Sequence, residues 1–107
     1  MTFPVYWTKF ATKKLDKIYK YYKTKVSKTI AQKLIDGIID KSIKIENNPN
    51  IGQKEELLSN RKEEFRYIVY KNHKIIYYKN PIHKSIEIIN VFDGRQNPNK
   101  IKKIKRI

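Results

Sequence analysis

The chain has 107 residues, a formal net charge of +15 and a mean hydropathy of −0.74. This length suits one small core, so we expect residues 1–107 to form a single domain. The absence of cysteine excludes disulfides, thiolate metal sites and cysteine nucleophiles. The sequence shows neither a membrane-spanning apolar run nor a signal-peptide core, which predicts a cytoplasmic protein that does not enter a membrane.

The first half of the chain predicts a strand followed by two helices. Val5 to Trp7 favour a short opening strand. From about Thr12 to Val26 the apolar residues recur at helical spacing, with lysines on the opposite face. Ser27 is a candidate N-cap of a second helix, which the segment "NNPN" at 47–50 should end. The expected apolar stripe of this second helix is Ile30, Ala31, Leu34, Ile35, Ile38 and Ile45. Because few residues separate the two helices, they should form an antiparallel hairpin.

The second half of the chain predicts strands. Residues 49–63 are polar and irregular, with Leu57 and Leu58 as the expected anchor. Three β-branched and aromatic runs follow, "FRYIVY", "KIIYY" and "SIEIINVF", separated by turn-forming residues. They indicate a three-stranded antiparallel meander. The whole order predicts an α+β fold in which a helical hairpin packs on one face of an antiparallel sheet.

The positive charge predicts a polyanionic partner, such as nucleic acid, the ribosome, anionic lipid or an acidic protein. A composition rich in lysine, isoleucine and asparagine is also typical of AT-rich coding sequence. Such a bias explains the choice of lysine over arginine but leaves the charge in place. Basic residues dominate the C-terminal end, and we expect three of them to contact nucleic acid or another target: Lys102, Lys103 and Lys105.

Common catalytic and cofactor motifs are missing. His73 and His83 both fall in predicted turns, and we interpret them as exposed turn residues rather than metal ligands. The scattered glycines build no nucleotide-binding loop. The paired carboxylates Glu55-Glu56 and Glu63-Glu64 are interpreted as solvated charge. The sequence therefore predicts neither a metal nor a cofactor.

Basic residues on the predicted sheet remain as candidate site residues. Arg66, Lys74 and Lys79 alternate there with tyrosines, a pattern that can hold phosphates and stack bases, although tyrosines of this kind also form ordinary cross-strand pairs. The arginines are the stronger signal, because a planar bidentate donor is rare in this lysine-rich chain and Arg61, Arg66 and Arg95 all cluster around the sheet.

The register of the hairpin after "FRYIVY" decides whether two of these residues can act together. A three-residue loop would pair Tyr70 with Lys74 and place Arg66 and Lys74 on one face of the sheet. A two-residue loop would place them on opposite faces. The sequence leaves both registers open.

The helical hairpin, the loop "NNPNIGQ", the run "FRYIVYKNHKIIYYK" and the ending "IEIINVFDGRQNP" resemble, in order and spacing, the RelE/ParE superfamily of bacterial toxins. The resemblance covers nearly the whole chain. It implies two helices packed on an antiparallel sheet and a toxin of a type II toxin–antitoxin system. It also implies a cognate acidic antitoxin as partner.

A RelE-like member would be an endoribonuclease that cleaves mRNA on the ribosome. The resemblance then implies that Arg66, Lys74 and Arg95 stabilise charge on the cleaved phosphate. RelE-like ribonucleases usually carry a tyrosine or histidine after the arginine turn, but "RQNPNKIKKIKRI" contains neither. Asp93 also stands where many relatives have histidine.

ParE-like members need no such residue, because they poison DNA gyrase by binding it. The missing residue therefore favours a ParE-like toxin without intrinsic catalysis, whereas the high basicity favours an RNA- or ribosome-directed role. Arg61 and Lys79 are further expected contacts to the target. A non-toxic basic nucleic-acid-binding module and an inactive toxin homologue are the remaining alternatives.

Overall fold

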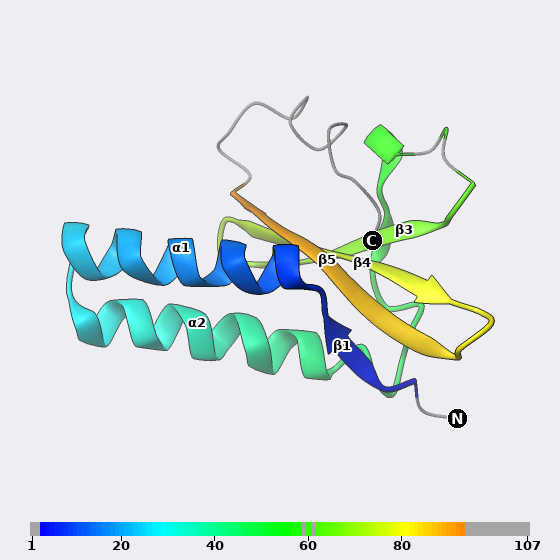
Figure 1. Ribbon diagram of the computed structural model, residues 1–107, viewed down its shortest axis with the longest axis horizontal. Coiled ribbons are helices and arrows are strands. Elements are labelled where there is room, and N and C mark those ends of the chain that lie inside the picture. The colour runs from blue at the N-terminus through cyan, green and yellow to red at the C-terminus, as the bar shows by residue number, and fades with distance from the viewer. Residues whose placement is uncertain (1–2, 59, 61, 94–107) are drawn as a thin grey trace.

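The computed structural model describes residues 3–58, 60 and 62–93 (Figure 1). In chain order the elements are β1 (Val5–Trp7), α1 (Lys9–Lys25), α2 (Lys28–Ile43), β2 (Gln53–Lys54), the short 3-10 helix η1 (Glu56–Leu58), β3 (Phe65–Tyr70), β4 (His73–Asn80) and β5 (Ser85–Asp93). The predicted strand, helical hairpin and three-stranded meander are confirmed. The strand β2 and the 3-10 helix η1 were not predicted and lie in the segment expected to be irregular.

The five strands form one sheet in the order β1-β5-β4-β3-β2. The meander is antiparallel as predicted, but β1 runs parallel to β5, with Val5 opposite Ile86 and Trp7 opposite Ile88. Parallel pairing is possible here because the helices and the other strands form a long connection between the two. The expected antiparallel sheet therefore has one parallel edge.

Side-chain caps set where the two helices begin. The Thr8 Oγ1 accepts a hydrogen bond from the Ala11 N–H at 3.1 Å, so α1 begins at Lys9 and not near Thr12. The Ser27 Oγ accepts from the Ile30 N–H at 3.1 Å and caps α2 as predicted. In the described part of the chain, no helix has both the length and the apolar character that a membrane crossing requires.

The helices lie side by side and antiparallel, with their connection at the end of the hairpin away from β1 (Figure 1). Most of the stripe expected for α2 is buried, namely Ala31, Leu34, Ile35, Ile38 and Ile45. Ile30 is the exception, because it is 45% exposed. It lies in the first turn of α2, next to the connection, where Val26 is also exposed. The prediction that Ile30 belongs to the core is therefore wrong.

Apolar side chains are buried on both faces of the sheet. The cluster on the helix-covered face includes Ile68, Ile75, Tyr77, Ile86, Ile88 and Val91, together with Ala11, Leu34, Ile38 and Ile45. The cluster on the opposite face consists of Leu58, Phe65, Ile76, Ile89 and Phe92. Leu58 is thus the buried anchor that we expected, whereas the side chain of Leu57 lies outside what the structure describes.

A β-bulge in β5 shifts the alternation of side chains between the two faces of the sheet. Ile76 lies opposite Asn90, but Tyr77 lies opposite Ile88, so Ile89 is an extra residue in β5. Ile88 and Val91, three residues apart, accordingly both join the helix-side cluster, whereas Ile89 and Phe92 join the other cluster. Simple alternation of side chains along the strand does not predict this arrangement.

Candidate functional site

The two basic residues that the sequence singled out on β3 and β4 lie on opposite faces of the sheet. Tyr70 pairs with His73, so the β3–β4 hairpin closes with a two-residue loop. Arg66 therefore lies opposite Tyr77 on the helix-covered face. Lys74 is an odd number of residues from Tyr77 along β4, so its side chain lies on the other face. Of the two registers left open by the sequence, the structure has the one that separates Arg66 from Lys74.

Arg66 binds the loop that precedes β2. Its Nη1 donates a hydrogen bond to the Gly52 carbonyl oxygen at 2.7 Å, and its Nε donates to Glu64 Oε2 at 2.9 Å. The side chain is only 18% exposed. Since both acceptors are engaged by a charged donor, these bonds are stronger than neutral ones.

Tyr77 holds the same loop from β4. Its side chain is fully buried, its hydroxyl donates to the Pro49 carbonyl oxygen at 2.7 Å, and it accepts from the Gly52 N–H at 3.0 Å. Burial raises the pKa of Tyr77, and the hydrogen bond from Gly52 only partly opposes this effect. Nearby, the Lys79 Nζ donates to Asn50 Oδ1 at 3.2 Å.

We call Arg66, Tyr77 and Lys79 the loop clamp, because together they fix residues 49–52 against the sheet. The fit is tight at Gly52, where an added Cβ would lie 2.6 Å from the Tyr67 carbonyl oxygen. Arg66, a catalytic candidate if the toxin is RelE-like, and Lys79, a candidate target contact, thus have structural partners within the chain.

Lys74 pairs with a buried carboxylate on the opposite face. Its Nζ lies 3.3 Å from Glu55 Oε2 and 4.3 Å from the centroid of the Tyr67 ring. Glu55 is only 4% exposed, so its interpretation as solvated charge is wrong. The Glu55 N–H donates to the Phe65 carbonyl oxygen at 2.8 Å, which extends the β2–β3 pairing and holds Glu55 against the sheet.

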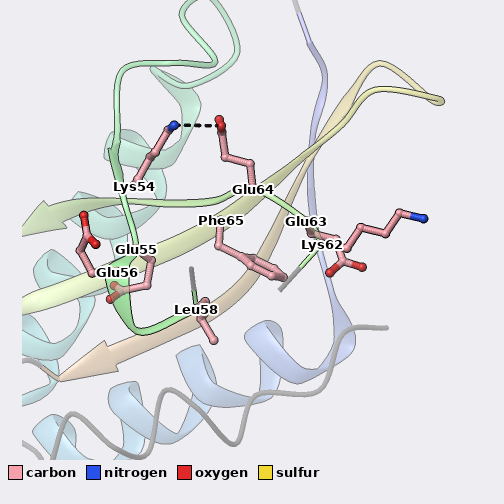
Figure 2. Close-up of a pocket in the computed structure, with 8 residues that line it drawn as sticks. All are labelled: Lys54, Glu55, Glu56, Leu58, Lys62, Glu63, Glu64 and Phe65. Atoms are coloured by element: carbon pink, nitrogen blue, oxygen red, sulfur yellow. Dashed lines mark ion pairs between the residues drawn. The ribbon is translucent and has the colours of Figure 1, made fainter. Parts of the chain in front are cut away.

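Glu55 also lines a pocket of about 280 Å³ (Figure 2). It is lined by Lys54, Glu55, Glu56, Leu58, Lys62, Glu63, Glu64 and Phe65. Within this lining, the Lys54 Nζ lies 3.5 Å from Glu64 Oε1. Burial alone would raise the pKa of Glu64, but the hydrogen bond and charge of Arg66, helped by Lys54, outweigh it and lower the pKa. Within the described residues no group of His, Cys, Asp or Glu could hold a metal ion.

His73 is buried, which contradicts its interpretation as an exposed turn residue. It is 1% exposed and its ring lies edge-on to Tyr22, with the ring centroids 6.2 Å apart. The two-residue loop explains this position, because it makes His73 the first residue of β4 instead of the last residue of a turn. His83 is exposed in the β4–β5 turn, as expected.

A groove of about 390 Å³ lies between α1 and the ends of β4 and β5. It is lined by Lys14, Lys17, Ile18, Tyr21, Tyr22, His73, Val91 and Asp93. The Asp93 Oδ1 accepts a hydrogen bond from the Asn72 side chain at 3.2 Å, which ties the end of β5 to the β3–β4 turn. Sequence reasoning missed this groove, because it depends on the hairpin register and on the packing of α1.

The other predicted site residues cannot be placed. Arg61, Arg95, Lys102, Lys103 and Lys105 lie outside the described residues, and their roles stay predictions.

Comparisons with known proteins agree with this fold. A family model described as "ParE toxin of type II toxin-antitoxin system, parDE" matches residues 5–98. A solved structure described as "Chromosomal ParDE TA system from P. aeruginosa" is similar with a TM-score of 0.71 and 19% sequence identity, covering 86% of this chain and 96% of that chain. No curated protein matches the sequence. The structural likeness supports the α+β RelE/ParE-like fold, and the family match extends over most of the chain. The chain therefore belongs to the ParE toxin family of type II toxin–antitoxin systems.

Proposed function

We propose that this toxin arrests bacterial growth by binding and poisoning DNA gyrase, and that it does not cleave RNA itself. The observation that carries the proposal is the separation of Arg66 and Lys74 onto opposite faces of the sheet. A ribonuclease of the RelE type would need both cations to contact the same phosphate group.

The chemistry of RNA cleavage makes this separation informative. Attack of a ribose 2′-hydroxyl on the adjacent phosphate builds negative charge on phosphoryl oxygens, and fixed cations lower the barrier only where they surround that charge. The Arg66 guanidinium instead binds Gly52 and Glu64, and the Lys74 ammonium binds Glu55. A surface-binding toxin does not require such convergence.

The family also suggests the partner that keeps the toxin inactive. The matched family and the similar structure both describe toxin–antitoxin systems. With a formal charge of +15, this chain suits an acidic antitoxin segment that folds on the toxin as it binds. We expect the antitoxin to cover the helical hairpin and its basic surroundings.

Induced expression in a bacterial host tests the proposal. DNA synthesis and protein synthesis would be followed separately by pulse labelling after induction. We expect DNA synthesis to fall first and co-expression of the antitoxin to restore growth. An early fall of protein synthesis would instead support the RelE-like endoribonuclease, and no arrest would support an inactive homologue or a plain nucleic-acid-binding module.

Arg95 is proposed as a target contact on the basis of the family resemblance. We expect Arg95→Ala to abolish the growth arrest while the thermal unfolding midpoint stays unchanged. An Arg95→Ala toxin of undiminished potency would exclude this role.

A further inference from the structure

The two helices of the hairpin carry very different charge. Helix α1 contains seven lysines and one acidic residue, Asp16, whereas α2 contains three lysines and two aspartates. A genomic preference for lysine codons acts on both helices alike. It therefore does not account for the concentration of positive charge on α1.

Four of these lysines form a row along one side of α1. Lys9, Lys13, Lys17 and Lys20 follow one another at spacings of three or four residues, which places them on one face of the helix, and all four are exposed. At about 1.5 Å of rise per residue the row is about 16 Å long. We call these four residues the lysine row.

The lysine row is available to a ligand. Asp16 forms an ion pair with Lys20 at 2.9 Å, but both side chains are more than half exposed. Exposed pairs of this kind are weak and screened by salt, so an incoming phosphate can replace the carboxylate.

We propose that the lysine row binds the phosphate backbone of duplex DNA. A duplex presents about one negative charge per 1.7 Å of its axis, so a straight row of ammonium groups on a convex surface can meet several phosphates. Helix α1 contains no arginine and so lacks the bidentate donor that most often reads guanine. The binding is therefore independent of base sequence.

Neighbouring side chains favour a duplex over a single strand. The exposed rings on α1 pack within the helix: Lys14 Nζ lies 5.9 Å from the Phe10 ring centroid, and Tyr21 lies edge-on to Tyr22. They are not arranged as platforms for stacked bases.

This inference goes beyond the proposed function and does not depend on it, because DNA binding is measured on the toxin alone. If the toxin also acts on gyrase, the lysine row would bring it to the DNA that gyrase holds.

The test is a titration of a fluorescent 20-base-pair DNA duplex with the full-length protein over a range of salt concentrations. The variant carries Lys13→Gln and Lys17→Gln, and a matched control on α2 carries Lys28→Gln and Lys33→Gln. Both pairs remove two exposed lysines and keep a good helix former. Losing two phosphate contacts should lower the slope of log K against log salt by about 1.8 and weaken binding at 0.1 M salt by about 50-fold.

We expect the α2 control to bind within about threefold of the unaltered protein. Equal losses in the two variants would show that net charge alone attracts DNA, and would overturn the proposal. Tighter binding of single-stranded DNA, of an RNA duplex or of polyglutamate at the same salt concentration would overturn the choice of ligand. Growth arrest by the α1 variant is scored separately, so a failure of this inference differs from a failure of the proposed function.

Discussion

The two faces of the sheet use their basic residues differently. On the helix-covered face, Arg66 donates to the backbone of the loop at 49–52, beside the buried hydroxyl of Tyr77. On the opposite face, Lys74 neutralises the buried carboxylate of Glu55. Basic residues on both faces of a sheet can therefore stabilise the fold, on one face by holding a loop and on the other by pairing with a buried carboxylate. The basic residues of α1 and of the C-terminal end are therefore better candidates for contacts to a target.

Breaking the Lys74–Glu55 pair should have the largest effect on stability. Lys74→Met removes the ammonium group that pairs with the buried Glu55 carboxylate, and breaking such a pair costs several kcal/mol in a fully buried setting. Because the Lys74 side chain is 27% exposed, we expect a loss of about 2–3 kcal/mol in the free energy of unfolding. Urea unfolding would measure it. Adding Glu55→Gln to this variant should recover much of the lost free energy of unfolding. If the double variant is as unstable as Lys74→Met alone, the broken ion pair is not the cause of the destabilisation.

Gly37→Ala tests how closely α2 packs on β3. A Cβ at Gly37 would overlap the ring of Tyr70, so we expect a loss of about 1–3 kcal/mol despite the better helix propensity of alanine. In a Tyr70→Ala background the overlap is gone, and the same change should stabilise the protein by about 0.5–1 kcal/mol. A loss of equal size in both backgrounds would contradict this account of the packing.

Tyr77→Phe tests the loop clamp on the helix-covered face. The change removes the donor to Pro49 and leaves the buried Gly52 N–H without its acceptor, so we expect a loss of about 1–2 kcal/mol at neutral pH.

The pH dependence of the same variant gives an independent check. Burial raises the pKa of Tyr77 above the ordinary value of 10.0, so its contribution is fully present below pH 10.0 and is lost as pH rises through the raised pKa. The stability difference between the unaltered protein and Tyr77→Phe should therefore shrink at alkaline pH. A constant difference would contradict the burial of this hydroxyl.

Glu64→Gln should have the smallest effect, because the Glu64 side chain is 48% exposed. Arg66 and Lys54 lower the pKa of Glu64 against the opposing effect of burial, so its contribution is present above pH 4.5 and lost as pH falls through the lowered pKa. Thermal melting between pH 3 and pH 6, about the ordinary carboxyl range, should show the two proteins converging in acid. If the difference in melting temperature between the two proteins stays the same at low pH, the ion pair of Glu64 contributes nothing to stability.

The sequence predicted the elements better than the faces on which their residues lie. Periodic apolar residues and the Ser27 cap were enough to find the helical hairpin and the meander. Local patterns contained no information on the parallel pairing of β1 with β5, because the partners are far apart in the chain. The strand β2 has only two residues and no apolar alternation, so its sequence resembles a loop.

The site was harder to predict because it depends on register. A change of one residue in the length of the hairpin loop decides whether Arg66 and Lys74 lie on the same face of the sheet. Glu55 is buried because its backbone N–H pairs with the Phe65 carbonyl oxygen. Its neighbours in the sequence are polar, so this burial could not be predicted from the local pattern. His73 was misassigned because one more residue in the hairpin loop would have left it exposed in a turn.

The most direct test of the proposed mechanism is a plasmid supercoiling and cleavage assay with purified gyrase and purified toxin. If this mechanism operates, added toxin should inhibit supercoiling and trap gyrase on cleaved plasmid, and an antitoxin added beforehand should prevent both effects. Gyrase of undiminished activity, together with cleavage of mRNA on purified ribosomes by the same preparation, would contradict it.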